Sequence, residues 1–102
     1  MDWARLAYWF TEAMRIAARS DANQESIIAA LRAVGCRVCY IKEPLDLLVS
    51  LRGETWLIEC KLPSKLPSKS QQEFIDRWAG KVVVVHNTRE ALEAILGAAA
   101  LK

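Results

Sequence analysis

The chain of 102 residues is long enough for one compact domain with a single core and leaves little room for a second. A composition of 53% hydrophobic and 25% charged residues excludes a disordered chain, and no run of about 18 uncharged apolar residues is present to span a bilayer. The net charge of +2 is too small to indicate a nucleic-acid partner by itself.

The N-terminus lacks the apolar core of an export signal, because charged residues interrupt it at Asp2, Arg5, Glu12 and Arg15. An odd number of cysteines in such a chain argues against a disulfide framework. We therefore expect a cytoplasmic protein, not attached to a membrane, with reduced thiols.

The first two segments have helical periodicity. Residues 3–19 place apolar side chains three and four positions apart, at Trp3, Leu6, Ala7, Phe10, Ala13, Met14 and Ala17. Tyr8 and Trp9 lie on the other side of this predicted helix, so both core packing and a subunit contact are open for it. Residues 20–23 offer capping side chains for a second helix, whose apolar positions recur until Gly35, at Ile27, Ile28, Leu31 and Val34.

Three strands are predicted next, at residues 37–41, 46–51 and 54–61, the last two joined by Arg52-Gly53 as a tight hairpin. Residues 62–70 carry two prolines, three serines and two lysines, which is typical of an exposed loop, and lead to a helix at about 71–78.

Residues 82–85 are four valines, a run typical of a strand covered on both faces in the middle of a parallel or mixed sheet. Asn87 with Glu90 three residues later forms a capping box for a final helix through Leu96. The predicted order is ααβββαβα, an α/β fold with a mixed central sheet flanked by helices in one domain, residues 1–102.

The hairpin brings two acids together. A two-residue loop at Arg52-Gly53 pairs Asp46 with Glu59, and directly opposed side chains share a face with Cβ atoms about 5 Å apart. Lys61, two positions beyond Glu59, points to the same face. The opposite face receives an apolar set that supports this register, Leu47, Val49, Trp56, Ile58 and Cys60.

Two carboxylates so close repel unless a cation holds them, and oxygen ligands suit Mg²⁺ or Mn²⁺. The alternative is an exposed, charged strand end at Glu59 and Lys61, with Asp46 merely ending a turn.

Pro44-Leu45-Asp46, thirteen residues ahead of Glu59-Cys60-Lys61 on a hairpin, resembles the PD-(D/E)XK signature of restriction-endonuclease-like nucleases. The resemblance is closest to the VRR-NUC branch, the virus-type replication-repair nucleases with small stand-alone phage members, and covers residues 21–96. Asn23-Gln24 and the spacing of Gln71, Phe74 and Trp78 support it.

This resemblance implies a restriction-endonuclease-like fold and a Mg²⁺- or Mn²⁺-dependent DNA endonuclease, a phosphodiester hydrolase of DNA repair. It implies that Asp46, Glu59 and the backbone carbonyl of Cys60 bind metal, that Lys61 attends the attacking water, and that Gln71 assists catalysis. Family members commonly add a glutamate from the helix before the first strand. Here Glu25 is the only acid in that turn, beside Gln24 and Ser26.

Phage members imply a branched substrate, a flap or a Holliday junction, and a resolvase that cuts a junction symmetrically needs two sites in a homodimer. The aromatic surface for such a dimer lies at Trp3, Tyr8, Trp9 and Phe10. Lys65, Lys69 and Arg77 could hold DNA phosphates without reading sequence, although a solvated face explains these charges equally well.

Other residues have structural explanations that outweigh functional ones. Cys36 and Cys39 resemble a zinc half-site that only Cys60 and His86 could complete, yet residues three apart on a strand face opposite ways. We expect His86 to be structural rather than a general base, Trp56 to be core, and Trp78 to pack on its helix.

Three functions from different classes remain open. The first is the metal-dependent nuclease, the second a DNA-binding module of the same fold with weak or no catalysis, and the third an interaction domain without nucleic acid. The set Asp46, Glu59 and Lys61 argues against the third.

Overall fold

The computed structural model describes residues 24–97. The helix expected at residues 3–19, the aromatic surface on it and the capping residues at 20–23 lie outside this range. The elements run in the order αβββαβα, which agrees with the predicted order from its second helix onward. They are α2 (Gln24–Ala33), β1 (Arg37–Tyr40), β2 (Leu47–Leu51), β3 (Glu54–Cys60), α3 (Lys69–Arg77), β4 (Lys81–Val85) and α4 (Thr88–Leu96).

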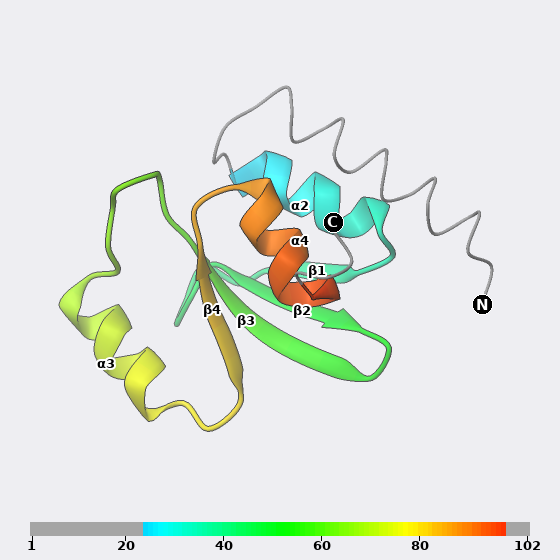
Figure 1. Cartoon of the computed structure of the whole chain (residues 1–102). Helices are drawn as coiled ribbons and strands as arrows, with labels where there is room; N and C mark the ends of the chain where they lie inside the picture. The colour runs from blue at the N-terminus through cyan, green and yellow to red at the C-terminus, as the bar shows by residue number, and fades with distance from the viewer. Residues whose placement is uncertain (1–23, 98–102) are drawn as a thin grey trace.

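The strands form one mixed four-stranded sheet in the order β1-β2-β3-β4 (Figure 1). β1 and β3 are antiparallel to β2, and β4 is parallel to β3. The chain therefore has a mixed α/β fold, as the sequence predicted.

β4 is an edge strand, and the prediction of a strand in the middle of the sheet was wrong. Within residues 24–97 it pairs with β3 alone. Val85 is buried, whereas Val82, Val83 and Val84 are partly exposed. The run of four valines is explained by the preference of valine for strands and by the burial of one face of β4. Whether a second strand or helix covers the remaining surface depends on distant parts of the chain.

The β2–β3 hairpin has the predicted register, with Leu51 opposite Glu54 and Leu47 opposite Ile58. Its two loop residues both take positive φ, 52° at Arg52 and 82° at Gly53, as in the type I′ turns that match the twist of a hairpin. The turn therefore fixes the pairing that carries both acids.

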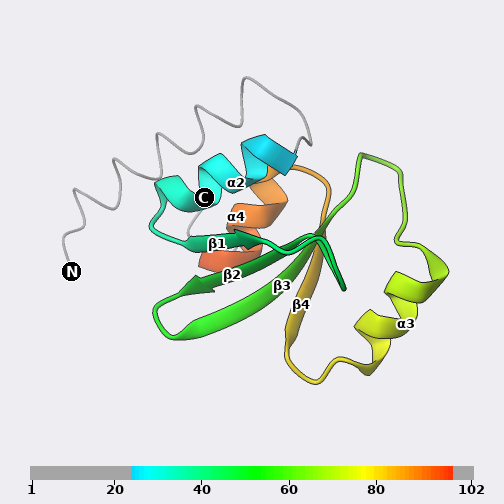
Figure 2. The same ribbon diagram turned by 180° about the vertical axis from the view of Figure 1, so that it is seen from behind.

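The core lies between one face of the sheet and the helices α2 and α4 (Figures 1 and 2). α2 ends where Gly35 turns the chain at φ 99°, as expected from its position. The predicted core-facing side of the hairpin is confirmed, since Leu47, Val49, Trp56 and Ile58 are buried in this core. Burial does not alternate along β3, because Leu57 and Glu59 are buried as well. Side chains at the intervening positions point to the other face of the sheet.

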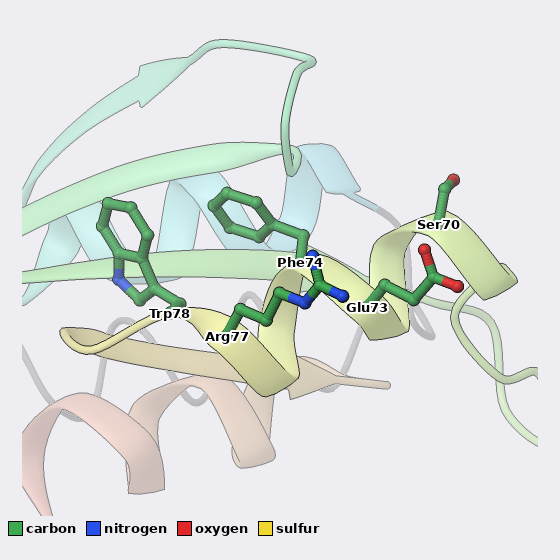
Figure 3. A pocket seen from close by; sticks show the side chains of 5 residues that line it. All are labelled: Ser70, Glu73, Phe74, Arg77 and Trp78. Atoms are coloured by element: carbon green, nitrogen blue, oxygen red, sulfur yellow. The ribbon is translucent and has the colours of Figure 1, made fainter.

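α3 begins two residues earlier than predicted. Ser68 caps it in a capping box with Gln71, so the helix starts at Lys69. None of its residues is buried, and it lies beside the sheet, away from α2 and α4 (Figure 2). Phe74 and Trp78 project from the same side of α3 and stack with their ring centroids 5.2 Å apart (Figure 3).

Nothing between residues 24 and 97 forms a helix long and apolar enough to cross a membrane.

The turn offers a test of the register. Gly53→Ala should lower the free energy of unfolding by about 1–2 kcal/mol, because alanine pays a steric penalty at positive φ. No atom lies within 4 Å of a Cβ at this position, so the loss is conformational rather than a clash. Urea unfolding of the full chain measures it. Gly53→Asn is the matched control and should lose less, since asparagine tolerates this region. Equal stability of the alanine variant and the parent would contradict the observed turn.

Candidate active site

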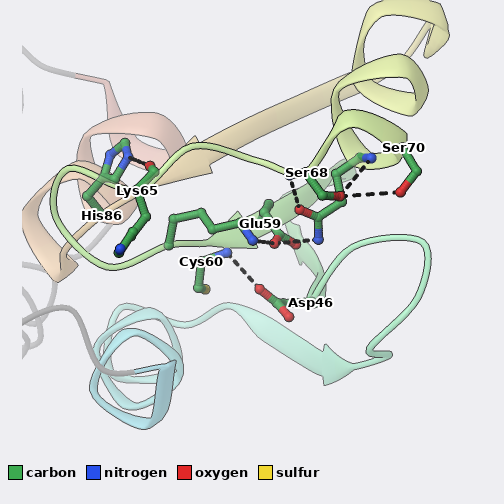
Figure 4. A network of polar contacts seen from close by, with 9 residues as sticks. Asp46, Glu59, Cys60, Lys65, Ser68, Ser70 and His86 are labelled. Atoms are coloured by element: carbon green, nitrogen blue, oxygen red, sulfur yellow. Dashed lines mark hydrogen bonds and ion pairs between the residues drawn. The ribbon is translucent and has the colours of Figure 1, made fainter.

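The predicted acids meet where β2 begins and β3 ends, on the sheet face turned away from α2 and α4 (Figure 4). Asp46 directly precedes β2. Since Leu47 pairs with Ile58, the next position along the hairpin brings Asp46 beside Glu59.

Asp46 is held by backbone groups. Its Oδ2 accepts a hydrogen bond from the Cys60 N–H at 2.8 Å, and its carbonyl accepts one from the Ile41 N–H at 2.9 Å. The carboxylate is therefore fixed at the seam between the two strands rather than free at the end of a turn.

Glu59 is a buried carboxylate, 2% exposed. Its Oε2 lies 3.2 Å from Lys61 Nζ and accepts a hydrogen bond from Gln71 Nε2 at 2.7 Å. Its Oε1 is buried and has no hydrogen-bond partner among the residues that the structure describes. An exposed strand end would leave both oxygens in water, so the alternative interpretation does not describe Glu59.

Burial raises the pKa of the Glu59 carboxyl, and the negative charge of Asp46 raises it further. The hydrogen bond and positive charge of Lys61 act in the opposite direction, and burial with Asp46 outweighs them. Ionised Glu59 is thus held in an environment that favours its neutral form. A cation at its unpartnered oxygen would reverse that preference.

Gln71 has two roles through one amide group. Its Oε1 accepts from the Ser68 N–H at 2.9 Å in the capping box of α3, while its Nε2 reaches Glu59. The cap therefore fixes the rotamer that contacts the acid. From the sequence Ser68 was expected in the loop, although the Ser-x-x-Gln spacing of Ser68 and Gln71 indicates a helix cap.

The acid of α2 is not brought into this cluster. Glu25 lies exposed in the first turn of α2, and nowhere in residues 24–97 do three or more His, Cys, Asp or Glu side chains converge as a metal-binding group. The expected ligation by Glu25 is thus not seen here. Asp46 and Glu59 remain as the two candidate carboxylate ligands.

The cysteines do not form a zinc site. Cys36 is buried, Cys39 is exposed, and all three thiols are free. Burial raises the pKa of the Cys60 thiol to about 12, with smaller contributions from the charges of Asp46 and Glu59, and burial raises that of Cys36 to about 11. Among residues 24–97 these cysteines do not converge with His86 into a group that could hold a metal ion.

The three basic residues expected to hold phosphates are exposed, and they are spread over a loop and the two ends of α3. Lys65 lies in the loop after β3, Lys69 is the first residue of α3, and Arg77 is its last. In Figure 4, Lys65 lies beside His86, whose Nε2 is 3.2 Å from the Lys65 carbonyl.

His86 makes contacts on both ring nitrogens. Its Nδ1 lies 3.0 Å from Glu90 Oε1 and its Nε2 lies 3.2 Å from the Lys65 carbonyl, so it ties the loop to the start of α4. The predicted capping of α4 is confirmed in one direction, because Asn87 Oδ1 accepts from the Glu90 N–H. The Glu90 carboxylate turns instead to His86 and to the Asn87 amide.

Comparison of the chain with models of protein families, with curated proteins and with solved structures gave no match in any of the three. The geometry of the site therefore carries the functional argument.

The raised pKa of Glu59 predicts a metal-dependent stability. A carboxyl whose pKa is higher in the folded than in the unfolded state contributes to protein stability at low pH. That contribution is lost as the pH rises from the unfolded-state pKa through the folded-state pKa. Mn²⁺ or Mg²⁺ should offset this loss at neutral pH, raising the free energy of unfolding by about 1–3 kcal/mol at concentrations ten to a hundred times Kd. Thermal unfolding with and without metal, at pH 4 and pH 7.5, measures both effects.

Glu59→Gln should abolish the metal increment and leave the metal-free protein at least as stable as the parent. Glu93→Gln, an exposed acid paired with Arg89 on α4, is the matched control and should keep the increment. An unchanged increment in Glu59→Gln would place the metal elsewhere.

The contacts of His86 predict its titration. The hydrogen bond to Glu90 raises the pKa of His86, and the bond to the Lys65 carbonyl adds to this. Its contribution to stability should therefore be present below its unfolded pKa, about 6.5, and disappear as pH rises through the folded value. His86 is the single histidine, so proton NMR titration reports it directly. We expect a pKa above 6.5 that falls in Glu90→Gln and stays unchanged in Glu93→Gln; equal values in all three would contradict the assignment.

Proposed function

We propose that this protein is a divalent-metal-dependent deoxyribonuclease of the PD-(D/E)XK type, in the VRR-NUC branch that its motif resembles. The observation that carries the proposal is the state of Glu59. It is a buried carboxylate beside Asp46, with one oxygen bonded to Lys61 and Gln71 and the other without a partner among residues 24–97. Buried charges are retained where they are paired or coordinate a metal.

The donor set fits magnesium or manganese. Carboxylate oxygens are hard ligands, and Mg²⁺ in nucleotide-processing sites is commonly held by one or two carboxylates together with water and substrate phosphates. Asp46 Oδ and Glu59 Oε1 would supply those two carboxylates, and the Cys60 carbonyl is a further candidate from the motif. When bound, such an ion lowers the pKa of water and neutralises charge on a phosphodiester.

Other residues of the site would orient the two acids and stabilise the charge on the phosphate. The Cys60 N–H orients Asp46, and Gln71 orients Glu59. Lys61 is 24% exposed, so its ammonium group lies between the buried acid and solvent, where it can meet the scissile phosphate as a compact positive charge. Phosphodiester hydrolysis needs both the oriented acids and that charge.

The substrate that we propose is branched DNA, a flap or a Holliday junction, as in the phage nucleases that the motif resembles. Lys65, Lys69 and Arg77 would contact phosphates without base readout. Symmetric cutting of a four-way junction requires two such sites, so a homodimer belongs to the junction version of the proposal. A monomer by light scattering would remove that version.

A nuclease assay tests the proposal. The full chain should cut flap or junction DNA in Mg²⁺ or Mn²⁺ and stop in EDTA. Glu59→Gln and Lys61→Ala should each lower the cleavage rate by about a hundredfold or more, since each removes a group that acts on transition-state charge. Gln71→Ala should lower it less, because it acts through Glu59. Glu93→Gln is the control and should cut at the parent rate, and circular dichroism should show all four variants folded.

One observation favours a second function, a DNA-binding module of this fold without catalysis. Within the described part of the chain only two acids converge, whereas the motif's family commonly supplies three. Retained binding of DNA with no cleavage in Mn²⁺ would select this function. Cleavage that depends on Glu59 would exclude it.

A further inference from the structure

The segment of residues 62–77, which comprises the loop after β3 and helix α3, is attached to the sheet mainly by polar contacts. None of its residues is buried, so no side chain anchors it in the core. Among the described residues, two hydrogen bonds join it to the rest of the structure. Gln71 Nε2 donates to Glu59 Oε2 at 2.7 Å, and the Lys65 carbonyl lies 3.2 Å from His86 Nε2 (Figure 4). The position of the segment therefore depends on contacts at Gln71 and Lys65.

The two ring nitrogens of His86 both face acceptors. Nδ1 lies 3.0 Å from Glu90 Oε1, a carboxylate oxygen, and Nε2 faces the Lys65 carbonyl. Neither an ionised carboxylate nor a carbonyl can donate a hydrogen bond. A neutral imidazole has one N–H and can donate to one of these groups, whereas the imidazolium donates to both. His86 therefore makes both hydrogen bonds only when it is protonated.

The deprotonated ring should keep its bond to Glu90 rather than the bond to Lys65. Hydrogen bonds to a charged acceptor are stronger than those to a neutral one, and Glu90 carries the charge. The Glu90 carboxylate is also held in place, because its Oε2 accepts from Asn87 Nδ2 at 3.2 Å in the cap of α4. The remaining proton thus stays on Nδ1. Nε2 then presents a lone pair to the Lys65 carbonyl, and the two acceptors repel each other.

We propose that His86 is a proton-dependent tie for the loop after β3: the imidazolium holds the Lys65 carbonyl at the start of α4, and the neutral ring keeps Glu90 and releases Lys65. The proton on Nε2 passes to solvent, and one hydrogen bond breaks. The bond between Gln71 and Glu59 then remains to join the segment to the sheet. The tie does not depend on the proposed nuclease function.

The groups around the ring favour its protonated form. The hydrogen bond to Glu90 on α4 raises the pKa of His86, the bond to the Lys65 carbonyl raises it further, burial lowers it, and the charge of Glu90 adds to the rise. Neighbouring cations are paired with other acids, Lys61 after β3 with Glu59 and Arg89 on α4 with Glu93. The tie should therefore open above the ordinary histidine pKa of about 6.5.

NMR spectroscopy of the full chain tests the tie with two independent readouts. The ¹⁵N shifts of the His86 ring identify the tautomer of the neutral form. Backbone ¹⁵N relaxation gives the order parameters of Lys65 and Leu66 as the pH is raised through the titration of His86. Rigid backbone has an order parameter of about 0.85, and flexible backbone has a value below about 0.6.

We expect the neutral ring to carry its proton on Nδ1. The order parameters of Lys65 and Leu66 should fall from about 0.85 to below about 0.6, with the same midpoint as the ring titration. A neutral ring protonated on Nε2 would overturn the proposal. So would a loop whose order does not change while His86 titrates.

Two variants separate the tie from a general effect of pH. Glu90→Gln should keep the loop ordered throughout, because the neutral ring can accept from the new amide at Nδ1 and keep its proton on Nε2 for the Lys65 carbonyl. His86→Ala should leave the loop flexible at every pH. Glu93→Gln is the matched control and should show the parent transition.

A fall in loop order across the titration of Glu90→Gln, or an ordered loop in His86→Ala, would overturn the proposal. The His86 side chain is 29% exposed and that of Glu90 is 40% exposed, so both substitutions should leave the core folded. Circular dichroism checks this. Because Glu90→Gln keeps the histidine, it tests the tie even where His86→Ala fails to fold.

Discussion

The structure depends on one strand pairing, which places a carboxylate where water is excluded. The type I′ turn at Arg52-Gly53 sets the register of β2 against β3, and that register fixes both the core and the site. On one face it buries Leu47 opposite Ile58; on the other it brings Asp46 beside Glu59. A slip by one residue would move the apolar side chains out of the core, so the stability of the core enforces the geometry of the acids.

Burying the charge of Glu59 costs free energy, and the hydrogen-bond donors around it all contact one of its two carboxylate oxygens. Removing a charge from water costs several kcal/mol even after relaxation, and one ion pair does not always offset this. Here Oε2 takes both available donors, from Lys61 and Gln71, while Oε1 has none among the residues in view. The uneven distribution leaves Oε1 as the oxygen that no donor among residues 24–97 reaches.

Local patterns made most of this geometry predictable, and non-local packing limited the rest. Alternation along residues 47–51 and 54–60 with a two-residue turn was sufficient for the register and for the proximity of Asp46 to Glu59. The cap at Ser68 was present in the sequence but obscured by the proline- and serine-rich loop before it. The edge position of β4 and the burial of Glu59 could not be predicted, since strand order and burial depend on contacts between segments far apart in the sequence.

The candidate site joins residues of the sheet, which are held by strand pairing, with Gln71 of α3, a helix that has no buried residue. Glu59 belongs to β3, Asp46 directly precedes β2 and Lys61 directly follows β3. The Lys61 N–H continues the pairing with β4 by donating to the Val85 carbonyl at 2.9 Å. α3 has no buried residue and reaches the site through Gln71, whose bond uses Glu59 Oε2. A cation at Oε1 would therefore leave this bond intact. Gln71 and an ion would thus use different oxygens of Glu59 and would not compete for one.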